Sequence, residues 1–133
     1  MRFVFDTNVV LSAALFEHSV PDQALRRALG VGDVLLSLAT LQELHDVLSR
    51  PKFERYVTLD EREEFLATLV NRVSLIEIKE TIEACRDPKD NKVLEVAVSG
   101  QATCIISGDE DLRVLHPFRG IPILTPAEFL AAF

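Results

Sequence analysis

Short apolar runs that stop abruptly at a polar residue recur along this chain. Phe3–Phe5 is followed directly by Asp6, and Val34–Leu36 is followed by Ser37. An uninterrupted apolar run is typical of a strand buried on both faces, as in a parallel sheet. The sequence predicts five strands of this kind: Phe3–Phe5, Val34–Leu36, Ser74–Ile78, Thr103–Ile106 and Ile121–Leu124.

Segments with helical periodicity and helix-boundary residues separate these strands. Pro21 suits the first turn of a helix, and Ser37 suits an N-cap. Acidic residues cluster from Asp60 to Glu64, where they favour a helix N-terminus. The expected helices are Val9–Leu15, Pro21–Leu29, a helix from Ser37 to about Ser49, Leu59–Val73, Asp87–Ser99 and a final helix after Thr125-Pro126.

The alternation of strands and helices predicts the fold class. Strands separated by helices imply an α/β fold with three layers, in which helices cover both faces of a mainly parallel sheet of about five strands. A length of 133 residues suits a single domain over residues 1–133. The segment Arg50–Val73 is expected to be a helical insertion that covers one edge of the functional site.

Composition narrows the class of protein. No apolar run reaches the roughly 18 residues of a membrane span, and Asp6 interrupts what would be the apolar part of a signal peptide. Cys85 and Cys104 have no metal-ligand spacing, and Cys104 lies in an apolar run. We therefore expect a reduced, cytoplasmic protein without membrane association.

The net charge of −7 argues against a basic nucleic-acid footprint. If several of the acids belong to a metal site, however, the net charge overstates how anionic the rest of the surface is. Two small basic groups remain, although either is equally well explained as solvated charge at helix ends. They are Arg50, Lys52 and Arg55, and Arg86, Lys89 and Lys92.

Asp6 is the first candidate for chemistry. It follows a predicted buried strand, and ligands of open α/β sheets bind just outside the carboxyl ends of strands. Asp6 could instead cap the next helix or start a turn through Asn8. Asp109 repeats the pattern after the strand that ends at Ile106, and it is favoured over Asp111, which lies two residues further on; either could cap a short helix.

Glu43 and Asp90 are candidates because of their positions in predicted helices. Glu43 flanks an apolar stripe, and Thr40-x-x-Glu43 also matches a capping box, although Ser37 is the better cap. Asp90 heads the apolar face of its helix, where an unpaired carboxylate would cost several kcal/mol, so a partner is implied. Asp87, with Pro88 after it, is better explained as an N-cap. The apolar face continues through Val93, Leu94, Ala97 and Val98.

Gathered carboxylates raise one another's pKa, and divalent cations compensate for this. Oxygen-only ligands favour Mg²⁺ or Mn²⁺, which bind phosphates and activate water. The reaction that these acids predict is metal-assisted hydrolysis of a phosphodiester. Asn8 and Ser107 could support the acids or be ordinary turn residues, and the three histidines (His18, His45 and His116) form no ligand spacing.

Four segments in order resemble the PIN domain, specifically the toxin components of bacterial and archaeal type II toxin–antitoxin pairs. They are Asp6-Thr7-Asn8, Glu43 in the helix after the second strand, Asp87–Ala97 with Asp90, and Ser107–Leu112 with Asp109. The resemblance implies a three-layer α/β fold and a Mg²⁺- or Mn²⁺-dependent ribonuclease. Asp6, Glu43, Asp90 and Asp109 would hold one or two metals, with Asp111 as an alternative fourth acid. It also implies a small antitoxin partner and a homodimer or higher oligomer, while Arg50, Lys52 or Lys92 could steer the RNA backbone.

Three alternatives compete with the nuclease interpretation. A haloacid-dehalogenase-like phosphatase would use Asp6 as a nucleophile, but it wants a second Asp at the position of Asn8. A PIN-fold binding module without activity would not need all four acids. In the third alternative the acids are helix caps only, and Mn²⁺ would then leave the melting temperature unchanged.

Overall fold

The centre of the molecule is a five-stranded sheet, seen here in a computed structural model that describes all 133 residues. Every neighbouring pair of strands is parallel, and the strand order is β3-β2-β1-β4-β5. The first strand is therefore central, with Phe3 beside both Val34 and Cys104. The strands are β1 (Arg2–Phe5), β2 (Asp33–Leu36), β3 (Ser74–Leu75), β4 (Cys104–Ile106) and β5 (Ile123–Leu124).

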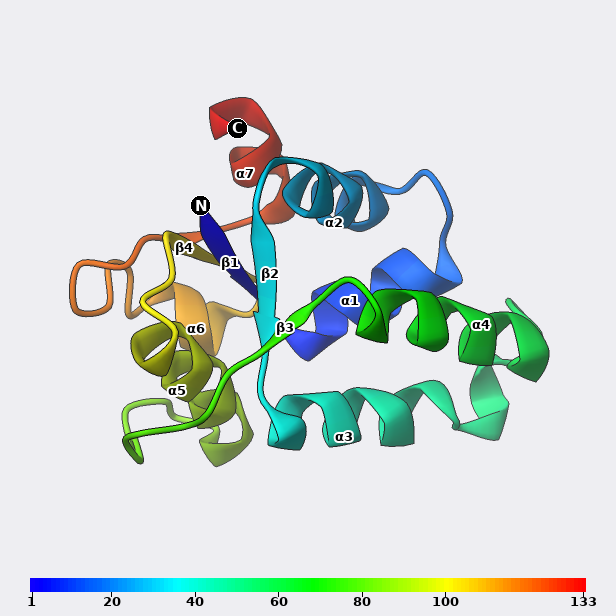
Figure 1. Cartoon of the computed structure of the whole chain (residues 1–133), viewed down its shortest axis with the longest axis horizontal. Coiled ribbons are helices and arrows are strands. Elements are labelled where there is room, and N and C mark those ends of the chain that lie inside the picture. The colour runs from blue at the N-terminus through cyan, green and yellow to red at the C-terminus, as the bar shows by residue number, and fades with distance from the viewer.

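Helices cover both faces of this sheet (Figure 1). They are α1 (Thr7–Leu15), α2 (Val20–Val31), α3 (Leu38–Leu48), α4 (Leu59–Val70), α5 (Asn91–Ser99), α6 (Glu110–Arg113) and α7 (Pro126–Ala132). Two short 3₁₀ helices, η1 (Pro51–Phe53) and η2 (Pro88–Asp90), precede α4 and α5. The predicted α/β fold with a parallel sheet is confirmed. No helix has the length and apolar character needed to cross a membrane.

Alternate residues of the central strands supply two separate cores. Phe3 and Phe5 face a cluster that includes side chains of α1, α2, α3 and α7, whereas Val4 faces a cluster built with α5 and Leu112 of α6. A strand points successive side chains to opposite faces, so a continuous apolar run serves both layers at once. This burial on two sides fixes the carboxyl end of β1, and therefore Asp6, in the middle of the fold.

Several element boundaries differ from the sequence prediction. The third strand is only Ser74–Leu75, because the chain then leaves the sheet to follow α5, and the fifth strand begins at Ile123 instead of Ile121. The predicted helix Asp87–Ser99 is divided into η2 and α5, which meet at Asp90. The helix predicted to reach Val73 ends at Val70.

The segment Arg50–Val73 contains η1 and α4, and α3 and α4 lie side by side as a helical hairpin (Figure 1). The expectation that this segment covers an edge of the acid site is wrong for α4. Leu69 of α4 joins the core that also includes α1 and α2. Side chains of α4 line pockets shared with α1 and α2 instead of the acids. Arg50 alone of the segment lines a pocket that contains Glu43.

Candidate metal centre

The carboxyl ends of the two central strands place Asp6 and Ser107 side by side. The register sets Phe5 of β1 beside Ile106 of β4, and the ladder continues when the Asp6 N–H donates to the Ile106 carbonyl at 3.0 Å. The next residue of each chain therefore emerges at the same sheet edge. Asp6 is buried, with 5% of its surface exposed, and Ser107 is fully buried.

Ser107 links two of the candidate acids. Its hydroxyl Oγ donates a 2.8 Å hydrogen bond to Oδ2 of Asp6, and the same oxygen accepts a 3.0 Å hydrogen bond from the Asp109 N–H. The other Asp6 oxygen, Oδ1, accepts from the backbone N–H of Asn8 at 3.3 Å. Asp6 therefore caps α1, as the structural alternative predicted, and is also fixed in orientation toward Asp109. The side chain of Asn8 is exposed and lines the pocket that contains Asp6 and Asp109.

Three carboxylates form the most compact acidic group. Asp90, Asp109 and Asp111 each place a carboxylate oxygen within 4.8 Å of the others, from η2 and from the start of α6. Asp109 also caps α6 by accepting from the Asp111 N–H at 2.9 Å. Arg86 lies 3.3 Å from Asp111 and is largely exposed. The structure thus places Asp109 and Asp111 together, where the sequence offered them as alternatives.

Asp90 has the least satisfied oxygen in this group. Its Oδ2 is buried without any hydrogen-bond partner. Burial raises the pKa of Asp90 to about 7, and the neighbouring Asp109 adds to the rise because a proton shared between the two carboxyls is favoured. The charges of Asp6 and Asp87 raise it further. Since its close neighbours are also carboxylates, Asp90 must either be protonated or have a cation as its partner.

The pKa of Asp6 is also raised. Burial raises its pKa, and the hydrogen bonds from Ser107 and Asn8 act in the opposite direction. The charges of Asp109 and Glu43 raise the pKa of Asp6 as well. Acids from four separate parts of the chain therefore interact electrostatically, although the compact group comes from only two of these parts, with Asp90 in one and Asp109 and Asp111 in the other.

Glu43 interacts electrostatically with Asp6 but is not part of the compact acidic group. It lies within α3, since Ser37 and Thr40 form the capping box of that helix, so the capping-box explanation of Glu43 is wrong. Its Oε2 accepts a 2.7 Å hydrogen bond from Nζ of Lys92 on α5. This ion pair holds Glu43 outside the compact group and places an ammonium beside it. Lys92 also lines the pocket that contains Glu43 and Arg50.

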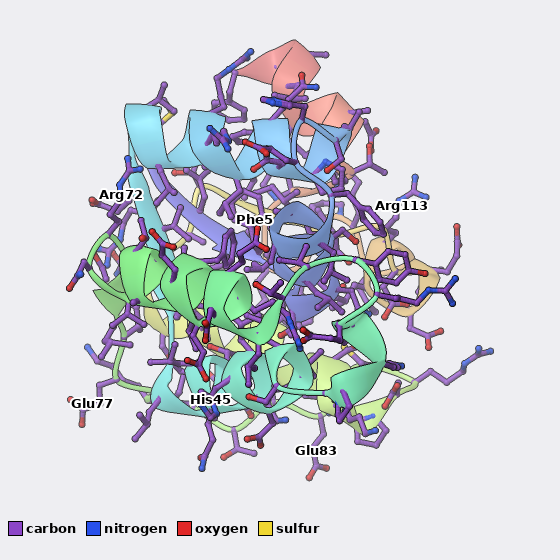
Figure 2. The ribbon with its side chains drawn as sticks, turned by 90° about the vertical axis from the view of Figure 1, so that its right-hand side faces the viewer. Phe5, His45, Arg72, Glu77, Glu83 and Arg113 are labelled. Carbon is purple, nitrogen blue, oxygen red and sulfur yellow. The ribbon has the colours of Figure 1, made fainter.

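The remaining candidates have ordinary structural roles. Asp87 caps η2 by accepting from the Lys89 N–H at 3.1 Å, as predicted for an N-cap followed by proline. Nδ1 of His116 accepts from the Ile123 N–H at 2.8 Å, and His45 is exposed on α3. Figure 2 shows Phe5 inside the molecule, whereas Arg72, Glu77 and Arg113 lie at its periphery.

A polar stripe on α5, which the sequence analysis did not identify, positions the segment that leads to Asp90. Asn91, Glu95 and Ser99 are four residues apart and therefore share one side of the helix. Oδ1 of Asn91 accepts from the backbone N–H groups of Ala84 and Cys85. Further along, Oε2 of Glu95 accepts from the Ile82 N–H, and Oγ of Ser99 accepts from the Lys79 N–H. The i, i+4, i+8 spacing of polar residues was the available signal.

The substitution Asn91→Ala is expected to lower the free energy of unfolding by about 1–3 kcal/mol, because two backbone donors lose their acceptor. Urea denaturation monitored by circular dichroism would measure this loss. Lys89→Ala is the control, because this exposed side chain has no contact of this kind and should change stability by less than about 0.5 kcal/mol. Equal stability of Asn91→Ala and the wild type would contradict the positioning role.

The donor set fits a hard divalent cation. All candidate ligands are carboxylates, which select Mg²⁺ or Mn²⁺ over softer metals. The unpartnered Oδ2 of Asp90 and the close approach of Asp109 and Asp111 are what a cation at this position would satisfy. Asp90, Asp109 and Asp111 are the residues best placed to hold it, with Asp6 adjacent.

A model of the PIN domain family matches residues 2–111, a span that contains Asp6, Glu43, Asp90, Asp109 and Asp111. The chain belongs to the PIN domain family. The uncharacterized protein MJ1680 of Methanocaldococcus jannaschii is 30% identical to this PIN domain over 143 aligned positions, covering 100% of this chain and 92% of that protein.

Two solved structures share the fold. VapBC2 from Rickettsia felis, bound to a DNA fragment from their promoter, has a TM-score of 0.65 at 11% identity and covers 94% of this chain and 98% of that one. PAE2754 from Pyrobaculum aerophilum has a TM-score of 0.65 at 15% identity and covers 100% of this chain and 91% of that one. The resemblance to PIN domains, first inferred from four short segments, is confirmed.

Proposed function

We propose that this PIN domain is a Mg²⁺- or Mn²⁺-dependent endoribonuclease, the toxin of a toxin–antitoxin pair acting in the cytoplasm. The observation that carries the proposal is the buried, unpartnered Oδ2 of Asp90 beside Asp109 and Asp111. Such a carboxylate is costly without a cation, so its presence favours a metal centre over a set of helix caps. The family match supports a nuclease, and the shared fold with VapBC2 supports a small antitoxin as partner.

The protein's own residues would divide the work as follows. The cation would be held by Asp90, Asp109 and Asp111. The carboxylate of Asp6, which the Ser107 hydroxyl orients, would lie beside them. A divalent cation bound there supplies Lewis acidity to a phosphodiester and lowers the pKa of bound water. Glu43 completes the proposed set from α3, and Lys92, whose ammonium donates to Glu43, would contact a phosphate oxygen of the substrate.

The test of the proposal is cleavage of a labelled single-stranded RNA with Mn²⁺, followed by gel electrophoresis. We expect cleavage that EDTA removes and that Asp6→Asn lowers by about 10- to 100-fold, the loss typical of residues that support a metal's direct ligands. Asp33→Asn serves as the control, because Asp33 is an exposed acid at the opposite end of β2.

Two outcomes would contradict the proposal. Cleavage that is the same in wild type and Asp6→Asn would trace the activity to a contaminating nuclease. A phosphoaspartate formed on Asp6 during turnover would instead favour the phosphatase alternative, because hydrolysis of RNA by activated water forms no such adduct.

A further inference from the structure

An exposed aromatic pair lies at the end of the molecule where α3 and α4 are joined, the end that faces the viewer in Figure 2. Phe16 follows α1 and is 46% exposed, and Tyr56 lies between η1 and α4 and is 51% exposed. Their ring centroids are 5.4 Å apart at an interplanar angle of 71°. Two large rings therefore meet at the surface from distant parts of the chain, where burial does not account for their presence.

Three cations lie in the segment that precedes Tyr56. The guanidinium of Arg55 lies 5.2 Å from the Tyr56 ring centroid, and Nζ of Lys52 lies 5.2 Å from the ring of Phe53. Arg50 is exposed just before η1. None of the three pairs with a carboxylate in the structure.

The acids closest in sequence to the rings are engaged elsewhere. Glu54 accepts from the buried guanidinium of Arg62 at 2.8 Å. Glu17 lies 3.7 Å from Arg26. In a chain whose net charge is −7, this leaves three unpaired cations in the segment from Arg50 to Arg55, and Arg55 lies beside the exposed ring of Tyr56. That combination complements a ligand that offers both anionic groups and flat rings.

Two helix faces connect this end of the molecule to the acids. Asn8 and Ser12 lie one turn apart on α1 and line the pocket that contains Asp6 and Asp109, and Phe16 follows one turn later as the C-cap of the helix. The nine residues of α1 span about 14 Å at about 1.5 Å per residue.

A second path runs along α3. Glu43, Val47 and Arg50 line one pocket together with Lys92, and Arg50 directly precedes η1. Because α1 and α3 pack against each other, both faces lead from the acids to the same aromatic and basic end of the molecule.

We propose that Phe16 and Tyr56 form a stacking platform for bases of single-stranded RNA flanking the hydrolysed phosphodiester, with Arg50, Lys52 and Arg55 neutralising the phosphates. The proposal rests on the ribonuclease function proposed above and assigns base binding, away from the acids, to these two side chains. Aromatic side chains hold single-stranded nucleic acid by stacking on base faces, and cations along the path neutralise its backbone. In a duplex the bases are already stacked and do not reach such a platform.

The test is fluorescence anisotropy with a labelled single-stranded oligoribonucleotide of mixed sequence and the full chain in EDTA, so that no cleavage occurs. Tyr56→Ala and Phe16→Ala should each weaken binding by about 5- to 100-fold, while Tyr56→Phe retains it. Tyr56→Leu keeps apolar area without an aromatic face and should resemble Tyr56→Ala. Arg55→Ala should lower the slope of log Kd against log salt by about 1.

Matched controls are exposed residues elsewhere: Leu38→Ala for lost apolar surface and Lys79→Ala for lost charge. The same RNA annealed to its complement should bind Tyr56→Ala and wild type equally. Wild-type affinity in Tyr56→Ala would overturn the platform. Two further results would overturn it. A change from dimer to monomer in Tyr56→Ala, measured by sedimentation, would show that a second copy of the chain occupies the rings. Loss of binding to a co-expressed protein partner, with RNA affinity intact, would show that this partner occupies them.

The two proposals fail separately. If wild type cleaves RNA with Mn²⁺ but Tyr56→Ala has unchanged Kd and KM, the platform is wrong and the ribonuclease stands. If the oligonucleotide binds through Tyr56 but Mn²⁺ produces no cleavage, the ribonuclease proposal is wrong and a single-stranded RNA-binding surface remains.

Discussion

Asp90→Asn is expected to lower the rate of Mn²⁺-dependent RNA cleavage by at least about 100-fold, without destabilising the metal-free protein. The amide keeps the shape of the carboxyl group but cannot ionise, and it offers N–H donors to the surrounding acids. Oδ2 of Asp90 has no partner in the structure, so no hydrogen bond is lost from it. A residue that stabilised the fold through its charge would show the opposite result.

The pH dependence of stability provides the second readout of this substitution. The pKa of Asp90 in the folded protein is raised to about 7 from an ordinary value of 3.8, chiefly by burial. The folded state therefore holds this proton where the unfolded chain has released it, so stability falls as the pH rises from about 4 to about 7. In EDTA, the melting temperature of Asp90→Asn should therefore rise relative to that of wild type as the pH increases from about 4 to about 7. Mn²⁺ should restore wild type and leave Asp90→Asn unchanged.

Asp87→Asn is the matched control for both readouts. Asp87 is exposed and caps η2, and asparagine is as good an N-cap as aspartate. Its cleavage rate should match that of wild type, and its loss of stability with rising pH should be slightly smaller, because the charge of Asp87 no longer raises the pKa of Asp90. A loss of cleavage in Asp87→Asn as large as that in Asp90→Asn would assign the effect to the local turn instead of the acidic group.

Arg62→Met should lower the free energy of unfolding by about 3 kcal/mol or more, because several buried hydrogen bonds are lost at once. Arg62 is 2% exposed although it lies on α4 among acids. Its guanidinium donates to the carbonyls of Leu48, Arg50 and Val57 and to Glu54. Methionine fills a similar volume but leaves several acceptors unpaired, each costing about 1–3 kcal/mol when buried.

Urea denaturation of Arg62→Met and Arg119→Met would separate burial from charge. Arg119 forms a two-point pair with Glu80, but both side chains are about half exposed. Its loss should cost less than about 1 kcal/mol. Similar losses in the two variants would show that the buried carbonyls find other partners, which would refute the proposed role of Arg62.

Local patterns sufficed to predict the layers of the fold. The runs Phe3–Phe5 and Val34–Leu36 must be buried on both faces, and Ser37 caps α3 as expected. The early end of β3 was not predictable in the same way, because the segment after Leu75 donates to Glu95 and Ser99, about 13 to 20 residues further along. Hydrogen bonds accepted by side chains of a later helix leave no local signature.

The candidate site shows the same division. Asp6 and Asp109 could be placed at one sheet edge because parallel strands carry their ends there. The ion pair between Glu43 and Lys92 and the position of Asp111 beside Asp90 depend on how α3, η2 and α6 pack. Arg62 was hidden for a further reason: among Glu61, Glu63 and Glu64 it has the pattern of a surface charge.

The central place of β1 has a consequence for the chain during its synthesis. Strands β1 and β2 are made early, but the second edge of β1 stays open until β4, at residues 104–106, has left the ribosome. Asp109 and Asp111 follow only after that point, so Asp6 and Asp90 wait for their partners until most of the chain exists. Such long-range pairing delays folding. A nascent or truncated chain therefore lacks the assembled acids, so the nuclease activity proposed above would begin only when translation of the chain is nearly complete.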